Sequence, residues 1–116
     1  MLHLKENPTL HDFQEYVQEL EIERGFSDQS SHDKCLLLGE EMGELFKAVR
    51  KASGLNIDVN SSFQSVSDEL ADILIYICSI ANRFDINLEK SFREKEKVNK
   101  QRTWAKMQTQ VQQDTR

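Results

Sequence analysis

Two short acidic motifs hold the residues best suited to chemistry, Glu41-Met42-Gly43-Glu44 and Glu69-Leu70-Ala71-Asp72. In each motif two carboxylates stand three residues apart, which places both on one face of a helix. Leucine and isoleucine surround both motifs, and a buried carboxylate that stays ionised without a partner costs much free energy. A cation would compensate that cost. Oxygen ligands without Cys or His in the motifs favour a hard cation, magnesium first and manganese second, so the sequence indicates a metal-dependent enzyme.

The acidic motifs are also compatible with a solvated surface or with a di-metal helical bundle. A single pair of carboxylates at this spacing is common on solvated helix faces, so the metal hypothesis depends on the two motifs together. A di-iron or di-manganese helical bundle also uses inward carboxylates, but it adds Glu-x-x-His motifs. The three histidines, His3, His11 and His32, do not have that spacing, which argues against such a bundle.

A second candidate group lies near the C-terminus, where Lys95, Asn99 and Arg102 are spaced to share one helix face. The segment 90–106 contains seven basic and two acidic residues. Taken alone, this pattern is also typical of a solvated basic face. Beside a carboxylate metal site, lysine and arginine are the side chains that hold phosphate oxygens. The combination predicts hydrolysis of a phosphoanhydride by water that the metal activates.

Four helices are expected to position these residues, because capping residues and glycines divide the chain into helical segments. The first runs from the cap Thr9 to residue 24 and ends at Gly25. The second begins after Ser30 or Ser31 and stops at Gly54. The third covers about residues 63–83 with Ser62 or Ser65 as its cap, and the fourth runs from Asn87 past Trp104. The fold class is all-α, with an N-terminal arm (1–8), one domain (9–106) and a flexible Gln-rich tail (107–116).

The third predicted helix is apolar around nearly its whole circumference between residues 70 and 81. A helix that is apolar on every side must be buried on every side. Three other helices of one small chain cannot easily do this, whereas a second subunit can. We therefore expect a homodimer or homotetramer that completes the four-helix domain.

Composition excludes several classes of partner. The net charge of −5 over 116 residues argues against nucleic acid. We expect no membrane partner and no signal peptide, because the N-terminus lacks a long apolar stretch and the longest apolar run, residues 73–81, is too short to span a bilayer. Cys35 and Cys78 are expected to be reduced and buried, as in a cytoplasmic protein.

A family resemblance emerges from three segments taken in order: Gly39 to Leu45, Asp68 to Leu74, and Lys95 through Asn99 to Arg102. Together they resemble the MazG-like nucleoside triphosphate pyrophosphohydrolases, an all-α superfamily whose signature is ExxE, a spacer and ExxD. The resemblance implies magnesium on Glu41, Glu44, Glu69 and Asp72. It also implies cleavage between the α- and β-phosphates of a (d)NTP, giving (d)NMP and pyrophosphate, as a house-cleaning activity on the nucleotide pool.

The resemblance further assigns roles to single residues. It implies catalytic roles for Glu40 and Glu41, with Glu40 orienting or deprotonating the attacking water, although Glu40 also fits a plain surface position. Phe26 matches an aromatic residue that could stack on a base or simply be part of the core. The residues implied to contact phosphate are Lys95, Asn99 and Arg102, with Lys47 as a weaker candidate.

Two alternative functions remain open from the sequence. The chain could be a non-catalytic helical oligomerisation module whose carboxylates form only salt bridges. It could also be a phosphoribosyl-ATP pyrophosphohydrolase or a dUTPase-type member of the same superfamily. Base preference does not follow from the sequence.

Overall fold

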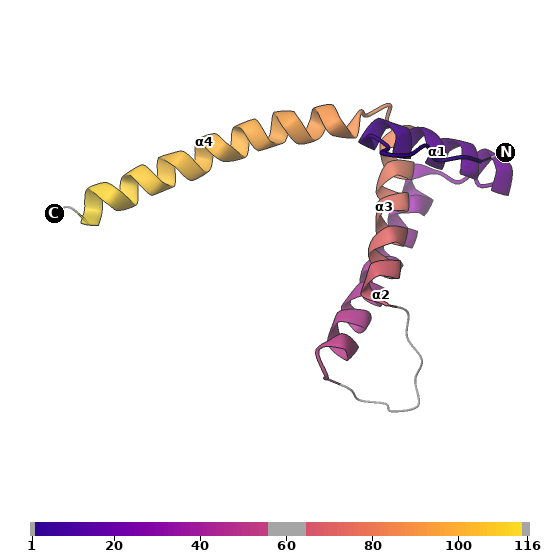
Figure 1. Cartoon of the computed structure of the whole chain (residues 1–116), viewed down its shortest axis with the longest axis horizontal. Coiled ribbons are helices and arrows are strands. Elements are labelled where there is room, and N and C mark those ends of the chain that lie inside the picture. The colour runs from indigo at the N-terminus through magenta and orange to yellow at the C-terminus, as the bar shows by residue number, and fades with distance from the viewer. Residues whose placement is uncertain (1, 56–64, 115–116) are drawn as a thin grey trace. The chain divides into compact units, whose positions relative to one another are not determined.

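The computed structural model describes residues 2–55 and 65–114, with side chains up to residue 102. Within these ranges the chain forms four helices and no strands: α1 (Leu10–Arg24), α2 (Ser31–Ala52), α3 (Val66–Arg83) and α4 (Leu88–Asp114) (Figure 1). The predicted all-α class is therefore confirmed. None of the described helices is both long and apolar enough to cross a membrane.

The helix boundaries follow from capping residues that the sequence already marks. The Thr9 hydroxyl accepts a hydrogen bond from the Asp12 N–H, and the Asp12 carboxylate accepts one from the Thr9 N–H. Ser30 and Asp33 form the same reciprocal box before α2. Such boxes satisfy backbone donors that the first helical turn leaves without partners. At the end of α1, Gly25 adopts a φ of 75°, the left-handed conformation that glycine tolerates best.

The third and fourth helices also begin at predicted caps. Ser65 accepts a hydrogen bond from the Asp68 N–H at 3.2 Å, so Ser65 is the cap of α3. The other candidate, Ser62, lies outside the described residues, as does Phe63. The Asn87 side chain accepts from the Lys90 N–H at 3.0 Å. α4 continues as a helix to Asp114; the flexible tail expected over residues 107–116 stays a prediction.

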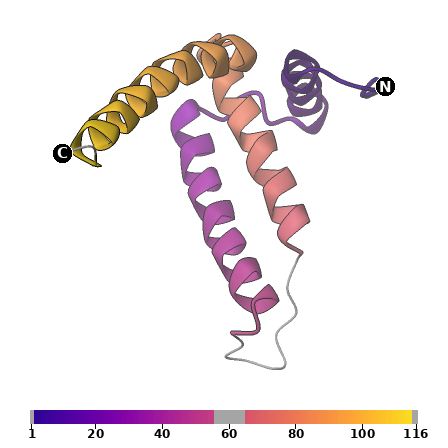
Figure 2. The same cartoon turned by 60° about the vertical axis from the view of Figure 1, so that its left-hand side comes forward.

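The chain divides into two units, residues 1–86 and residues 87–116. In the first unit, α2 and α3 lie side by side, and α1 packs against α3 (Figure 2). A polar contact reinforces the second pairing. The Gln14 side-chain amide donates to the Asn82 side chain and to the Ile86 carbonyl, and the Asn82 amide donates back to the Gln14 carbonyl. The second unit is α4.

The core of the first unit is small and contains charged residues. Its buried apolar residues are Val17, Leu20, Ala48, Cys78 and Ala81. Glu21, Lys34, Lys51 and Glu69 are buried with them. Burying a charge is unfavourable unless it is paired or binds a ligand. The buried charged residues are therefore candidates for a functional role.

Several apolar side chains of α2 are exposed. Met42 is 42% exposed and Phe46 is 66% exposed. Cys35, expected to be buried, is exposed, whereas Cys78 is buried as predicted, and both are free thiols. The reason is that α2 turns the face with Lys34, Glu41 and Ala48 toward its neighbours, so Cys35 falls on another face.

Candidate active site

A carboxylate cluster joins the two acidic motifs across α2 and α3. Glu41 comes from α2, and Glu69 and Asp72 come from the first two turns of α3. One oxygen from each of the three carboxylates lies within 4.8 Å of the other two. The helix pair brings the motifs together although Glu41 and Glu69 are 28 positions apart in the sequence. This is the arrangement that a small cation with oxygen ligands requires.

The electrostatics of the cluster favour binding of a cation. Glu69 is only 1% exposed. Within the described chain, Glu41 Oε2 and Glu69 Oε2 are buried without a hydrogen-bond partner. A hydrogen bond with Glu69, burial, and the charges of Asp72, Glu69 and Glu44 together raise the pKa of Glu41 to about 7. Carboxylates this close cannot all ionise at low cost, so either a proton or a cation must sit among them. The orphaned oxygens fit a metal ion.

Two further acidic residues, Glu44 of the first motif and Glu40 directly before it, occupy less enclosed positions. Glu44 is exposed one turn beyond Glu41 and is not among the three converging carboxylates, although its charge helps to raise the pKa of Glu41. Glu40 is also exposed, and its charge contributes to a raised pKa of Tyr76, after burial and the charges of Glu41 and Asp72. The structure therefore brings three of the four predicted ligands together.

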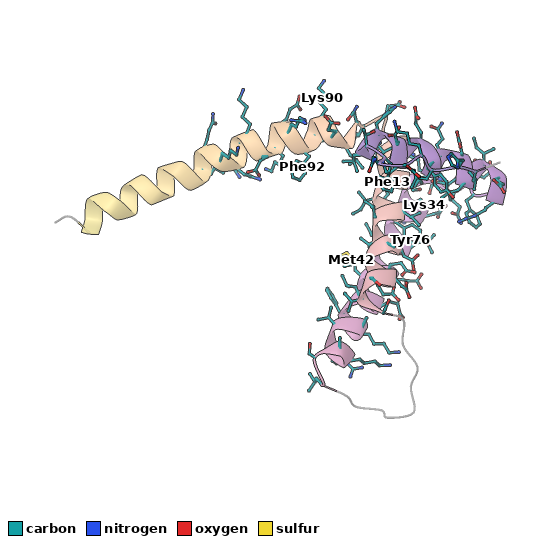
Figure 3. The ribbon with its side chains drawn as sticks, viewed as in Figure 1. Phe13, Lys34, Met42, Tyr76, Lys90 and Phe92 are labelled. Atoms are coloured by element: carbon teal, nitrogen blue, oxygen red, sulfur yellow. The ribbon has the colours of Figure 1, made fainter. Side chains whose placement is uncertain are left out.

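A cavity of about 440 Å³ adjoins the cluster. Glu41 and Asp72 line it together with Phe26 and Tyr76, so it contains carboxylates and aromatic rings. Figure 3 shows Lys34 and Tyr76 on one side of the helix pair and Met42 on the other. Phe26 is 42% exposed. The ring predicted to contact a base thus lines the same cavity as two of the carboxylates.

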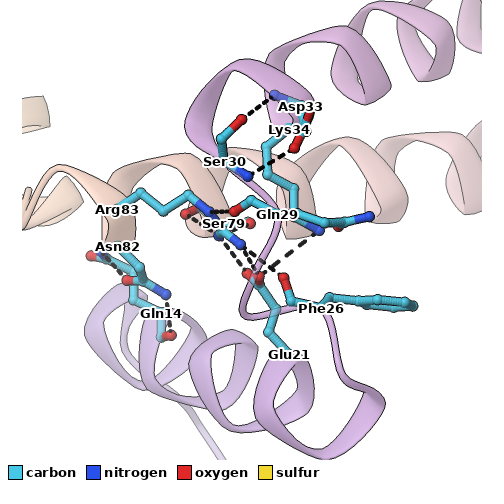
Figure 4. Close-up of polar contacts among 10 residues, drawn as sticks. All are labelled: Gln14, Glu21, Phe26, Gln29, Ser30, Asp33, Lys34, Ser79, Asn82 and Arg83. Atoms are coloured by element: carbon cyan, nitrogen blue, oxygen red, sulfur yellow. Dashed lines mark hydrogen bonds and ion pairs between the residues drawn. The ribbon is translucent and has the colours of Figure 1, made fainter.

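A second charged group lies next to the cavity: Glu21 of α1, which lines it, pairs with Arg83 of α3 (Figure 4). Arg83 Nη1 donates to Glu21 Oε1 at 3.0 Å, and Arg83 Nη2 donates to Glu21 Oε2. Arg83 also donates to the backbone carbonyls of Phe26 and Gln29 at 3.1 and 2.8 Å. The guanidinium therefore fixes the connection between α1 and α2, which carries Phe26.

The pKa of Glu21 reflects this pairing. Burial opposes ionisation of Glu21, but hydrogen bonds from Arg83 and Ser79 and the charges of Arg83 and Lys34 outweigh it, so its pKa is lowered. Glu21 is therefore ionised at neutral pH. Lys34 lies at the edge of this group, with its Nζ 3.8 Å from Glu21 Oε2.

Four residues of this region were not predicted from the sequence: Glu21, Lys34, Tyr76 and Arg83. A signal for three of them is present. Asp72, Tyr76 and Arg83 are separated by four and seven residues, and Lys34 precedes Glu41 by seven. Those spacings keep residues on one helix face. Extending each motif along its own face would have found them.

The predicted phosphate-binding residues come from α2 and α4. Lys47 is exposed on α2 and is not among the residues that line the described cavity. Lys95, Asn99 and Arg102 lie on α4, in the second unit. Lys95 and Arg102 are exposed, whereas Asn99 is partly buried. Their contacts with phosphate stay predictions.

The comparisons with known proteins agree with this geometry. Residues 29–105 match the family model of the MazG nucleotide pyrophosphohydrolase domain. The crystal structure of iMazG from Vibrio DAT 722 in its Ntag form is 32% identical, with a TM-score of 0.62, over 81% of this chain and 96% of that one. The Ctag form is 33% identical, with the same TM-score, over 79% and 98%. The comparison with curated proteins gave no match. The chain belongs to the MazG nucleotide pyrophosphohydrolase family.

Proposed function

We propose that this protein is a magnesium-dependent nucleoside triphosphate pyrophosphohydrolase that converts a (d)NTP into (d)NMP and pyrophosphate. The observation that carries the proposal is the convergence of Glu41, Glu69 and Asp72, with two buried and unpartnered oxygens, at one end of a cavity of about 440 Å³. Family membership supports the reaction class. The alternative of an oligomerisation module gives no reason for unpartnered carboxylates to converge.

The metal ligands in this proposal are Glu41, Glu69 and Asp72, with Glu44 as the fourth. All four offer only oxygen, which suits magnesium, with manganese as a substitute. When bound, the metal would neutralise charge on the phosphate oxygens and make water a better nucleophile. The carboxylates hold the ion, and Glu69, almost fully buried, has the least freedom to leave the cluster.

Other residues of this chain would orient the substrate and the water. Glu40 is placed beside Glu41 in the chain and would orient or deprotonate the attacking water. Phe26 lines the cavity and would contact the base. The basic groups proposed to hold the outer phosphate oxygens are Lys47, Lys95, Asn99 and Arg102.

We further propose that the active form is a homodimer or homotetramer. The support is the apolar surface that one chain leaves open: Leu70 of α3 is 52% exposed, and Met42 and Phe46 of α2 are also exposed. Large apolar side chains exposed on two neighbouring helices are typical of a protein that buries them against a partner. Light scattering at micromolar concentration tests the proposal, and a stable particle with the 13.5 kDa mass of one chain would contradict it.

The reaction is tested with a panel of canonical and modified nucleoside triphosphates, including dUTP, together with phosphoribosyl-ATP. The full chain is incubated with magnesium, and the products are separated. We expect monophosphate and pyrophosphate in equal amounts. Glu41→Gln and Glu69→Gln serve as background controls. Release of orthophosphate alone would contradict the proposed bond cleavage, and no turnover of any compound would favour an oligomerisation module.

A further inference from the structure

Lys34 is a buried cation on the wall of the proposed substrate cavity. Its residue is 4% exposed, and it lines the cavity together with Glu41 and Asp72. Its Nζ lies 5.2 Å from the centre of the Phe26 ring and 5.6 Å from that of the Tyr76 ring. Cation–π contacts of this kind hold an ammonium group in place.

The ammonium group of Lys34 is not neutralised one to one. Its nearest carboxylate oxygen, Glu21 Oε2, is 3.8 Å away, which is longer than a hydrogen bond. Glu21 is already bound by two nitrogen atoms of Arg83. Two cations therefore share one carboxylate in this group (Figure 4). Burying a surplus charge is unfavourable without a further partner.

We propose that Lys34 is a specificity-determining residue, which donates a hydrogen bond to an acceptor atom on the nucleobase of the substrate. This inference rests on the proposed function. Lys34 and Glu41 are seven residues apart on one face of α2, which is about 10 Å along the helix. A nucleotide whose phosphates lie at the carboxylates would extend its base over that length toward Lys34.

The cavity wall favours a base over a phosphate group at this end. Leu20, Leu37 and Ile75 are apolar, and Phe26 and Tyr76 offer ring surfaces on which a base can stack. The Glu21 carboxylate would repel a phosphate. The guanidinium nitrogens of Arg83 already donate to Glu21, Ser79, Gln29 and Phe26. The basic residues among those that line the cavity are Lys34 and Arg24, and a phosphate there would also face the Glu21 carboxylate. A base needs only one acceptor atom matched to the Lys34 ammonium group, and it gains from the apolar and aromatic wall.

The kinetic test compares Lys34→Met with wild type on the four dNTPs and on 2′-deoxyribose 5′-triphosphate, which lacks a base. We expect Lys34→Met to lower kcat/KM for the preferred dNTP by about tenfold or more, mainly through KM, because a charged hydrogen bond is lost. The value for the baseless compound should not change. An equal loss on both would assign Lys34 to phosphate, and no loss on either would assign it a structural role. Both outcomes overturn the inference.

Two controls separate binding from stability. Methionine has nearly the length of lysine but no charge, and in Lys34→Met the Glu21 carboxylate still pairs with Arg83. The variant should therefore stay folded, which thermal melting checks. Lys5→Met removes an exposed lysine that pairs with Asp12 near the start of α1, and it should leave the dNTP preference unchanged. If Lys5→Met altered the preference equally, the effect would be one of net charge, and the inference would fail.

A binding test distinguishes failure of this inference from failure of the proposed function. The metal-free wild type and Lys34→Met are titrated with the four deoxynucleosides, which carry no phosphate, and followed by NMR. Wild type should show shifts at Phe26 and Tyr76 that Lys34→Met weakens. If no triphosphate is hydrolysed but these shifts depend on Lys34, the function fails and the base site stands. If triphosphates are hydrolysed and neither the shifts nor KM depend on Lys34, the base site fails alone.

Discussion

The carboxylate cluster and the Glu21–Arg83 pair are both buried charged groups built on α3, yet their charges are arranged in opposite ways. At the start of α3, Glu69 and Asp72 meet Glu41, and all the charges have the same sign. At the end of α3, Arg83 meets Glu21, and the two charges are opposite and joined by hydrogen bonds. The same helix thus carries one group of charges that lacks a counter-charge and one group in which the charges are largely compensated.

The difference indicates that the carboxylate cluster is built to bind a ligand, whereas the Glu21–Arg83 pair stabilises the fold. The pair of Glu21 and Arg83 satisfies its own hydrogen bonds and links α1, α3 and the connection that carries Phe26. Among the described residues the carboxylate cluster has oxygens without hydrogen-bond partners, and the pKa of Glu41 is raised to about 7, so the cluster would gain from a bound cation. Repulsion within the cluster lowers stability until that cation binds.

The largest effect is expected from Glu69→Gln. Loss of one proposed metal ligand should remove several kcal/mol of charge stabilisation in the transition state. At 1.36 kcal/mol per factor of ten, this corresponds to a loss of turnover of about 1,000-fold. The metal-free variant should melt at the same temperature as wild type or higher, because one repelling charge is gone. Steady-state kinetics and melting curves with and without magnesium measure both. A variant that stays active while magnesium gives no thermal shift would identify the carboxylates as structural.

The opposite pattern is expected from Arg83→Met. Removing the guanidinium leaves the Glu21 charge buried with Ser79 and, as its nearest remaining cation, Lys34 at 3.8 Å, and it frees the carbonyls of Phe26 and Gln29. Breaking a buried pair on one side is strongly destabilising, here by about 3 kcal/mol. Urea unfolding of the metal-free protein gives the value. The double variant Glu21→Leu with Arg83→Met should recover part of the loss, because no lone charge remains. A single variant as stable as wild type would show that the pair does not hold the fold.

The two groups should also give opposite pH dependences. The pKa of Glu41 is raised to about 7, so between pH 4.5 and 7 the folded metal-free protein binds more protons than the unfolded chain. Its free energy of unfolding should therefore fall as the pH rises through that range. The pKa of Glu21 is lowered, so its contribution is present at neutral pH and is lost as the pH falls below the ordinary range of a glutamate.

Unfolding curves at pH 5, 6, 7 and 8 measure the first of these slopes. Glu41→Gln removes the titrating group and should flatten the curve across the neutral range. Magnesium at saturating concentration should flatten or invert it in wild type, because the ion binds the ionised carboxylates. A slope that Glu41→Gln leaves unchanged would show that another group titrates.

The sequence predicts the local features well and the long-range ones only in part. Thr9, Ser30 and Gly25 mark helix ends by chemistry that acts within four residues, and the structure has those ends. The pairing of Glu41 with Glu69 and Asp72 was predictable because both motifs stand out. Arg83 shares a helix face with Asp72, but its partner Glu21 is 62 positions away and has no distinctive pattern, so only the packing of α1 on α3 reveals the pair. The exposure of Cys35 was not predicted, because α2 turns the face with Lys34, Glu41 and Ala48 toward its neighbours.

The smallest effects are expected from variants on α4. These variants test whether this third charged region contacts the substrate at defined positions or acts only through its net charge. At 100° per residue, Lys95, Asn99 and Arg102 fall within about 60° of one another, whereas Lys97 and Lys100 lie about 140° to 200° from Lys95. Replacing a residue of the first set with Ala should lower kcat/KM by up to about tenfold if it holds a phosphate oxygen. Replacing Lys97 or Lys100 removes the same formal charge from an exposed position. It should cost about twofold at low salt and less at high salt, because exposed charges act only through screened attraction. Equal, salt-sensitive losses at Lys95, Lys97, Lys100 and Arg102, with no loss at the neutral Asn99, would mean that α4 attracts nucleotides without contacting them at defined points.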